Sequence, residues 1–142
     1  MSGVNWLPRP DRDSADWWAA LARHELLLQA CQDCGRRRWP ARAICNRCSS
    51  LRWDWIQACG TATIASWTVT RRPPVPGVEV PYVVVLARLD DQSDVLVPGF
   101  WGGDAEGLDL AIGLPVVVGF DDLESAEGTR SSLLRWASQV TP

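Results

Sequence analysis

Four cysteines carry the clearest chemical signal in this sequence. They form two Cys-x-x-Cys pairs, Cys31 with Cys34 and Cys45 with Cys48, and ten residues separate the pairs. Each pair can fold into a tight turn that presents two sulfurs, so four thiolates can surround one tetrahedral ion. Gly35 directly follows the first pair, where such a turn favours a glycine. The spacing therefore predicts a zinc ribbon with one structural Zn²⁺ on all four cysteines, with iron or disulfides as the alternatives.

The remaining thiol and the only histidine add no recognisable catalytic group. Cys59 is expected to be a small buried residue at the start of a strand, because no histidine lies near it in sequence. His24 is expected to be exposed or to cap a helix, since no acid or nucleophile pairs with it recognisably. We therefore predict no catalytic residues, and four cysteines would close the coordination shell of the metal against water.

Length and composition indicate one soluble domain, or two small ones that share a core. The chain has 142 residues, of which 46% are apolar and 22% charged, as in globular proteins. No apolar run approaches the roughly 20 residues that span a bilayer, and the N-terminal segment lacks a signal-peptide core. Five cysteines, four of them assigned to a metal, fit a reducing compartment. We therefore expect a cytoplasmic protein with no membrane interaction.

The charged residues are distributed unevenly along the chain. Residues 31–52 hold six arginines and one acid, whereas residues 77–128 hold eleven acids and one arginine. The acidic C-terminal half would repel a phosphate backbone, so we expect no nucleic-acid partner. A single-stranded nucleic-acid-binding module, with Trp67 and Tyr82 as stacking platforms, remains an alternative of a different class.

The expected secondary structure is mainly β. Residues 1–24 are predicted to form an irregular arm and a short helix at 15–24 that Ser14 can cap, and residues 25–57 the ribbon. Residues 58–142 are predicted to form a barrel of five strands with one helical turn between the third and fourth strands. This order is typical of an OB-fold, although an SH3-like barrel or a small sandwich would look similar. The expected strands and the turn span 26–30, 37–40, 51–56, 60–70, 81–89, 94–101, 107–112, 115–120 and 131–137.

Tryptophans supply a candidate interaction surface. Nine tryptophans in a chain of this size exceed what one core needs, so some are expected to be covered by another protein. We assign a partner interface to Trp17, Trp18 and Leu21, which share one face of the predicted helix, and to Trp39. The alternative is that the helix covers the ribbon or the barrel of the same chain.

Nearly all of the sequence resembles the zinc-ribbon OB-fold acyl-CoA-associated proteins, the family called domain of unknown function thirty-five. The resemblance extends from the helix to the last strand. It is carried by the segments C-Q-D-C-G, R-W-P-A-R, C-N-R-C, C-G-T-A-T-I-A-S-W-T-V-T, P-Y-V-V-V-L-A-R-L-D and G-L-D-L-A-I-G-L-P-V-V-V-G-F. Asn46 and Ser49 replace a proline and a glycine that members often carry after the third and fourth cysteines. All four ligands remain in place.

This resemblance implies an accessory subunit that is not an enzyme on its own. Members are similar in binding thiolase-fold enzymes: archaeal acetoacetyl-CoA thiolase with hydroxymethylglutaryl-CoA synthase, phloroglucinol acetyltransferases, and sterol-carrier-type aldolases that shorten bacterial steroid side chains. We therefore expect a subunit that supports a thiolase-like lyase or aldolase of steroid degradation and shapes its acyl-CoA site. A biosynthetic thiolase or acetyltransferase is the alternative partner. The resemblance also implies a heterotetramer of two plus two chains.

Arginines are the candidate contacts with coenzyme A. Arg71 and Arg72 begin a proline-rich loop at 71–78, which is either a rigid solvated connection or a prong that meets a partner or ligand phosphates. Arg36 is the third candidate. It belongs to a group of ribbon arginines that form either a solvated face or a basic patch for phosphates or an acidic partner. The other members of that group are Arg37, Arg38 and Arg42.

Overall fold

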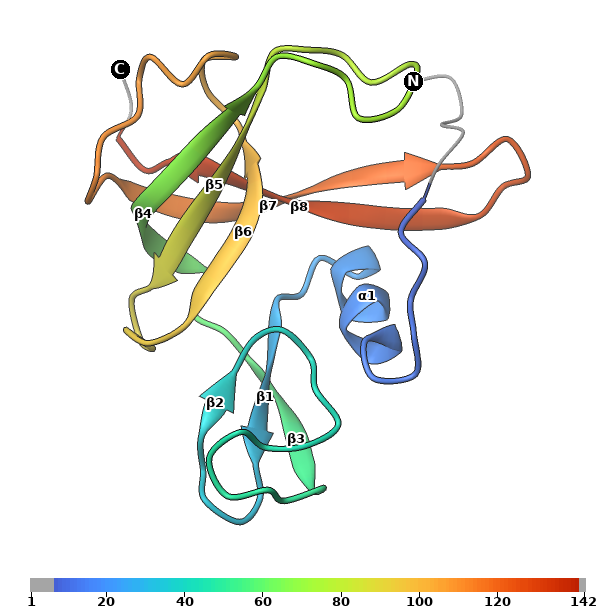
Figure 1. Ribbon diagram of the computed structural model, residues 1–142, viewed down its shortest axis with the longest axis vertical. Coiled ribbons are helices and arrows are strands. Elements are labelled where there is room, and N and C mark those ends of the chain that lie inside the picture. Colours follow the sequence, from blue (N-terminus) through green and yellow to red (C-terminus); the bar gives the residue numbers. More distant parts are fainter. Residues whose placement is uncertain (1–6, 141–142) are drawn as a thin grey trace. The chain divides into compact units, whose positions relative to one another are not determined.

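The fold is mainly β with one short helix, in a computed structural model that describes residues 7–140 (Figure 1). The first part of the predicted arm and the last two residues of the predicted barrel lie outside this range. The chain divides into two compact units, which we describe separately. One contains Met1–Cys59 with Phe120–Leu133, and the other Gly60–Gly119 with Leu134–Pro142. The predicted fold class, with a helix, a cysteine-rich ribbon and a five-stranded barrel, is confirmed.

Helix α1 spans Ala15–Ala22 and places an apolar face inside its unit. Trp17 is 7% exposed and Leu21 is 0% exposed, as expected for residues four apart on one face of a helix. Ser14 occupies the position before the helix, but its side chain makes no capping bond. Its hydroxyl instead donates to Asp11, at 2.7 Å. The prediction that Ser14 caps the helix through its side chain was therefore wrong.

The helix ends two residues before the predicted position. His24 adopts a left-handed backbone conformation, with φ of 62°. The N–H of His24 then donates to the carbonyl of Leu21 at 2.8 Å, and the N–H of Glu25 donates to Ala20 at 2.9 Å. These bonds satisfy the last carbonyl groups of the helix and turn the chain into the ribbon.

The ribbon is a small antiparallel sheet with the strand order β2-β1-β3. Gln29 lies opposite Arg38 on one side and opposite Trp55 on the other, and Cys31 lies opposite Trp53. Alternate residues of a strand share a face, so Gln29 and Cys31 point to the same side of the sheet. The strands are β1 Leu27–Cys31, β2 Arg37–Arg38 and β3 Trp53–Gln57.

The other five strands form a closed barrel with the strand order β4-β5-β6-β8-β7, most of it in the second unit, and residues 120–124 of β7 and 130–133 of β8 belong to the first unit. β4 is antiparallel to β5 and β7, β5 is antiparallel to β6, and β6 and β8 run parallel where Phe100 faces Arg135. Val85, Val97 and Trp136 are each 0% exposed and fill the interior. The indole N–H of Trp136 donates to the Val97 carbonyl at 3.2 Å, so this buried polar group is satisfied. The strands are β4 Thr61–Thr70, β5 Tyr82–Leu89, β6 Leu96–Trp101, β7 Pro115–Glu124 and β8 Arg130–Ser138.

The connection between β6 and β7 is a series of turns, so the predicted helical turn at 107–112 was wrong. Two carboxylates organise it. Asp104 accepts the N–H groups of Glu106 and Leu108, both at 3.0 Å. Asp109 accepts the indole N–H of Trp101 at 2.8 Å. Short acidic side chains that bond nearby backbone favour turns over helix.

Candidate functional site

The four cysteines of the two Cys-x-x-Cys pairs converge on one point. Their sulfurs all lie within 4.8 Å of one another. The Sγ atoms of Cys31 and Cys48 are 3.5 Å apart, and those of Cys34 and Cys45 are 3.6 Å apart. A tetrahedral zinc ion with bonds of about 2.3 Å requires sulfurs roughly 3.8 Å apart, so this ligand set can bind one Zn²⁺.

Backbone N–H groups around the cysteines favour the thiolate form of individual side chains. Four adjacent thiolates would repel one another unless a cation is bound among them. The N–H of Cys34 points at the Cys31 sulfur and lowers the pKa of that thiol to about 6. The N–H of Arg47 likewise lowers the pKa of Cys45. The N–H of Ser50 favours the Cys48 thiolate, yet burial and the adjacent sulfurs raise the pKa of Cys48 to about 12. A bound cation removes this conflict, because the metal replaces the thiol protons.

A polar contact ties the two cysteine turns together beside the sulfurs. Asp33, within the first pair, accepts from the Ser50 hydroxyl and from the Arg52 guanidinium. These bonds lower the pKa of Asp33, first through Ser50 and then through Arg52. The turns are therefore held in register by side chains as well as by the shared cysteine cluster.

The ribbon arginines do not form one solvated face. Arg37 and Arg42 are exposed and Arg36 is half-buried, but Arg38 is only 5% exposed. Arg38 donates to the carbonyl of Arg42 at 3.2 Å, and its guanidinium lies over the Trp53 ring, 5.8 Å from the centroid. The solvated-face interpretation is therefore wrong for Arg38, which forms part of the interior of the ribbon.

The four predicted interface residues differ in their exposure. Trp17 and Leu21 are buried in the first unit, whereas Trp18 and Trp39 are half-buried. The Trp17 ring meets Trp18 edge-on at 4.9 Å and Trp39 at 5.8 Å between centroids. Burial favours the core interpretation for Trp17 and Leu21. Of the four residues, only Trp18 and Trp39 have exposed side-chain surface that a partner could contact.

The arginines of the proline-rich loop are both exposed. Arg71 pairs with Glu106 at 3.1 Å, on the connection between β6 and β7. Such a pair at the surface adds little stability and is easily exchanged for another anion. Arg71 and Arg72 therefore stand in solvent where a ligand can reach them, within the barrel unit.

His24 belongs to a cluster of side chains that was not predicted from the sequence. The His24 ring stacks on Phe120 with centroids 5.1 Å apart, and its Nε2 lies 2.8 Å from Asp122. The Ser132 hydroxyl donates to the same carboxylate oxygen at 2.6 Å. These bonds lower the pKa of Asp122, first through Ser132 and then through His24. The serine points to the acid and not to the histidine, so the group fastens α1 to the β7–β8 hairpin and is not a nucleophile–base pair.

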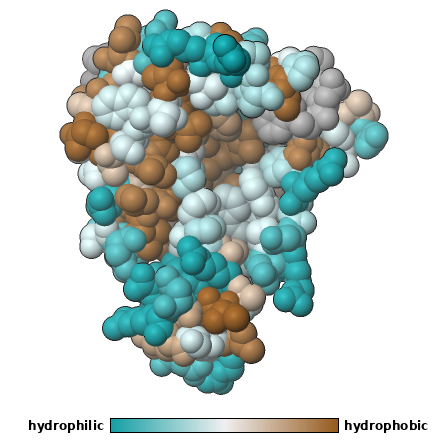
Figure 2. Space-filling model, in the orientation of Figure 1, coloured by the Kyte–Doolittle hydropathy of each residue, from teal (hydrophilic) through white to brown (hydrophobic). Residues whose placement is uncertain are grey.

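Several exposures also differ from expectation or were not anticipated. Cys59 is exposed, so the prediction of a buried residue was wrong. Leu108 and Ile112 are 84% and 68% exposed on the barrel unit. Ile44 and Leu51 are 53% and 67% exposed on the ribbon. Figure 2 shows apolar residues at the surface of both regions among hydrophilic ones. Apolar residues scattered singly over a surface are normal in soluble proteins, so these exposures alone define no binding site.

The fold and the cysteine cluster define a class of protein, a rubredoxin-like zinc ribbon joined to an OB-fold barrel. Within residues 7–140, no helix has the length and apolar composition to cross a bilayer. Two family models match the chain: the rubredoxin-like zinc ribbon domain of ChsH2 at residues 18–54, and the C-terminal OB-fold domain of ChsH2 at residues 55–121. The chain belongs to this ChsH2-type family of DUF35 proteins, and the resemblance inferred from sequence is confirmed.

Curated relatives include subunits of two hydratases and one scaffold protein. The chain is 37% identical over 113 residues to a probable enoyl-CoA hydratase alpha subunit of Thermomonospora curvata. It is 32% identical over 112 residues to the 3-oxo-4,17-pregnadiene-20-carboxyl-CoA hydratase alpha subunit of Mycobacterium tuberculosis. The matches cover 78% and 77% of this chain but 34% of each subunit. A DUF35 domain-containing scaffold protein of Pyrococcus furiosus is 30% identical over 62% of this chain and 65% of its own length.

Solved structures share the same architecture. One, described as the Ltp2-ChsH2(DUF35) aldolase, is 33% identical with a TM-score of 0.77, over 94% of this chain and 100% of the matched chain. A DUF35-family protein of unknown function from Sulfolobus solfataricus is 15% identical, with a TM-score of 0.61 over 90% of this chain and 86% of the other. The second likeness concerns the fold alone.

Proposed function

We propose that this chain is a non-catalytic accessory subunit of a thiolase-fold acyl-CoA enzyme, an aldolase or lyase that shortens steroid side chains. The observation that carries the proposal is the 33% identity to a chain of the Ltp2-ChsH2(DUF35) aldolase over 94% of this chain. A likeness of this extent includes both the ribbon and the barrel. The pregnadiene carboxyl-CoA hydratase relative supports a steroid thioester as the substrate class.

The metal centre supports a structural role over a catalytic one. Four cysteines supply the full coordination number of zinc, which leaves no ligand position for water or substrate. When bound, the ion supplies folding energy, on the order of 10 kcal/mol in small zinc domains. The residues of this chain hold the ribbon in shape, and the chemistry belongs to the partner.

Coenzyme A contacts are proposed for Arg71 and Arg72, which are both exposed, and Arg71 has only a surface pair with Glu106. Of the three candidates, Arg36 is the least suitable for contact with coenzyme A, because its Nε is enclosed. In the complex, Arg71→Gln with Arg72→Gln should raise the KM for acyl-CoA severalfold and leave kcat nearly unchanged. Arg130→Gln on the β7–β8 hairpin is the matched control, since Arg130 is also exposed and paired with a glutamate. An unchanged KM would assign the loop a scaffolding role.

Association is tested by co-expression with a thiolase-fold enzyme and purification through a tag on that enzyme. We expect an equimolar complex, a heterotetramer of two plus two chains, with a mass measurable by light scattering. A chain that elutes alone, with the partner intact and folded, would contradict the proposal. A biosynthetic thiolase or acetyltransferase in place of the aldolase is the alternative, and the same experiment with each enzyme separates them.

The hydratase relatives favour a second candidate. The chain corresponds to about a third of each hydratase alpha subunit, so it also resembles a part that accompanies a hydratase. A hydratase partner would bind this chain and add water to an enoyl-CoA. Retention of a hydratase rather than a thiolase-fold enzyme in the pull-down would favour this candidate.

A further inference from the structure

The ribbon contains a buried arginine whose hydrogen-bonding groups are not all used. Arg38 is 5% exposed, and its Nε and Nη1 are enclosed and have no hydrogen-bond partner. Its Nη2 donates to the Arg42 carbonyl, a neutral group. The Nε of Arg36 is also enclosed and without a partner. Burying a cation in this way costs free energy unless a negative charge lies close by.

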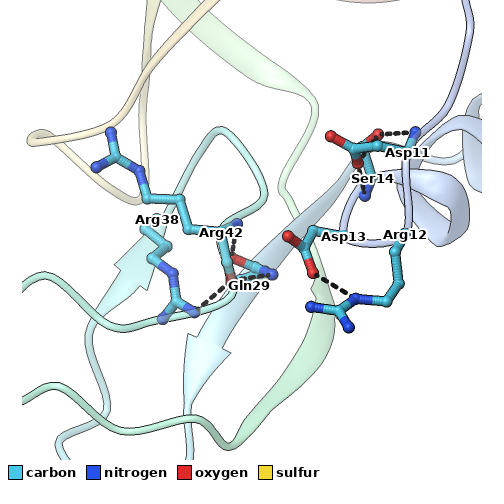
Figure 3. Close-up of polar contacts among 7 residues, drawn as sticks. All are labelled: Asp11, Arg12, Asp13, Ser14, Gln29, Arg38 and Arg42. Atoms are coloured by element: carbon cyan, nitrogen blue, oxygen red, sulfur yellow. Dashed lines mark hydrogen bonds and ion pairs between the residues drawn. The ribbon is translucent and has the colours of Figure 1, made fainter.

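The sheet register places the Arg38 side chain on the same face of the ribbon as the Cys31 side chain. Arg38 on β2 lies opposite Gln29 of β1, yet its guanidinium lies over Trp53, which is opposite Cys31 on the far side of β1. Adjacent strands are about 4.8 Å apart, so a contact between the Arg38 side chain from β2 and the Trp53 ring from β3 is made over β1, on the face that the two side chains share. Figure 3 shows Arg38 and Gln29 turned toward the same backbone at Arg42. The guanidinium therefore lies over β1 on the face that carries the Cys31 side chain.

Arg36 is on the same face. The Cys31 N–H donates to the Arg36 carbonyl at 2.9 Å, which places the two residues opposite one another. Residues two apart on a strand share a face, so Arg36 and Arg38 both point toward the cysteine side, and Arg37 points away. Arg37 is correspondingly exposed.

The carboxylates of the ribbon are engaged elsewhere. Asp33 bonds to Ser50 and Arg52, and Asp54 accepts from the Gln32 amide. Glu25 pairs with Arg23. An anion from solvent does not reach the enclosed Nε and Nη1 atoms. Within the ribbon, the negative charge that these pairs leave over is the cysteine cluster, because one Zn²⁺ with four thiolates carries a net charge of about −2.

We propose that Arg38 and Arg36 are the counter-ions of the metal–tetrathiolate centre. Their positive charges favour the dianionic, metal-loaded cluster over the metal-free thiols. They also lower the nucleophilicity of the sulfurs toward electrophiles. The inference rests on zinc occupancy of the four cysteines, but not on the identity of the partner enzyme.

The test uses the full zinc-loaded chain and competition with a chromophoric zinc chelator. A positive charge close to a dianion, at an effective dielectric constant of about 20, contributes a factor of ten or more to affinity. Arg36→Gln and Arg38→Gln should each weaken zinc affinity at least tenfold and speed thiol alkylation. Arg37→Gln removes the same charge from the opposite face of the same strand and should change neither quantity more than about twofold.

Two outcomes overturn the inference. In one, Arg36→Gln and Arg38→Gln hold zinc as tightly as Arg37→Gln. In the other, Arg38→Lys, which retains the charge, loses as much affinity as Arg38→Gln, which would indicate packing rather than charge. If Arg38→Gln does not fold, the half-buried Arg36 carries the test alone. If the wild-type chain binds no zinc, the assignment of the metal site is wrong. This result differs from a failure of the counter-ion role, in which the wild type binds zinc but the arginine variants bind it equally well.

Discussion

Gly99→Ala should destabilise the barrel by about 3 kcal/mol, near the upper end for overpacked cores. Gly99 lies on β6, which neighbours β8 in the barrel. A Cβ added there would lie 2.6 Å from Leu134 Cδ2, 2.7 Å from Trp136 Cδ1 and 3.0 Å from the Leu134 carbonyl oxygen. Leu134 and Trp136 are 4% and 0% exposed, so neither side chain has free space in which to move.

The expected loss in melting temperature follows from the size of the chain. At roughly 2–4 °C per kcal/mol for a domain of this size, the melting temperature should fall by roughly 6–12 °C. Urea denaturation of the zinc-saturated protein, followed by tryptophan fluorescence, measures the loss of free energy directly.

Gly119→Ala is the matched control for this substitution. Gly119 lies in β7 of the same barrel, and an added Cβ would meet the Arg135 carbonyl at 3.6 Å, an ordinary contact. Its stability should stay within about 1 kcal/mol of wild type, since Gly→Ala at an unstrained position lowers the entropy of the unfolded chain. Equal stability of the two variants would refute the claim that close packing at β6 and β8 requires glycine.

Three further predictions concern the first unit. Cys34→Ser should abolish stoichiometric zinc and raise amide exchange throughout the ribbon, because zinc binding supplies on the order of 10 kcal/mol; full metal content by mass spectrometry would contradict it. Asp122 has a lowered pKa in the folded protein, so its stabilising effect should be full above the unfolded value near 3.8 and should fade as pH falls through the folded value. The difference in unfolding free energy between wild type and Asp122→Asn should therefore narrow on acidification. A difference that does not depend on pH would contradict a stabilising role of the ionised Asp122 carboxylate. Trp18→Ala should weaken partner association at least tenfold with little change in melting temperature, and a large drop in melting temperature with unchanged affinity would place Trp18 in the core.

The metal ligands were predictable because the constraint on them is local. Two Cys-x-x-Cys turns present four sulfurs whatever surrounds them, and the structure brings those sulfurs within 4.8 Å. The barrel strands were likewise predictable, since β4 and β5 are rich in β-branched residues and bury alternate side chains, over most of β5 and over the first half of β4. Both signals arise from neighbours along the chain.

Features that depend on distant contacts were not predictable. In the sequence Arg38 is one of three consecutive arginines, which predicts an exposed side chain. It is buried because its guanidinium contacts the Arg42 carbonyl and the Trp53 ring. The pairing of His24 with Asp122 joins residues 98 positions apart. The segment after β6 was predicted to contain one helical turn, but the Asp104 carboxylate accepts the backbone N–H groups of Glu106 and Leu108 and stabilises turns instead.

The proposed role as an accessory subunit is tested most directly by an activity measurement on three samples: the purified chain, a thiolase-fold aldolase as the proposed partner, and the two combined. The substrate is a 3-hydroxyacyl-CoA with a bulky side chain, and carbon–carbon cleavage is followed by release of the carbonyl product. We predict no turnover by the chain alone and cleavage by the combination at a rate well above that of the aldolase by itself. Cleavage by this chain in the absence of the aldolase, or an aldolase indifferent to its addition, would contradict the assignment of an accessory subunit.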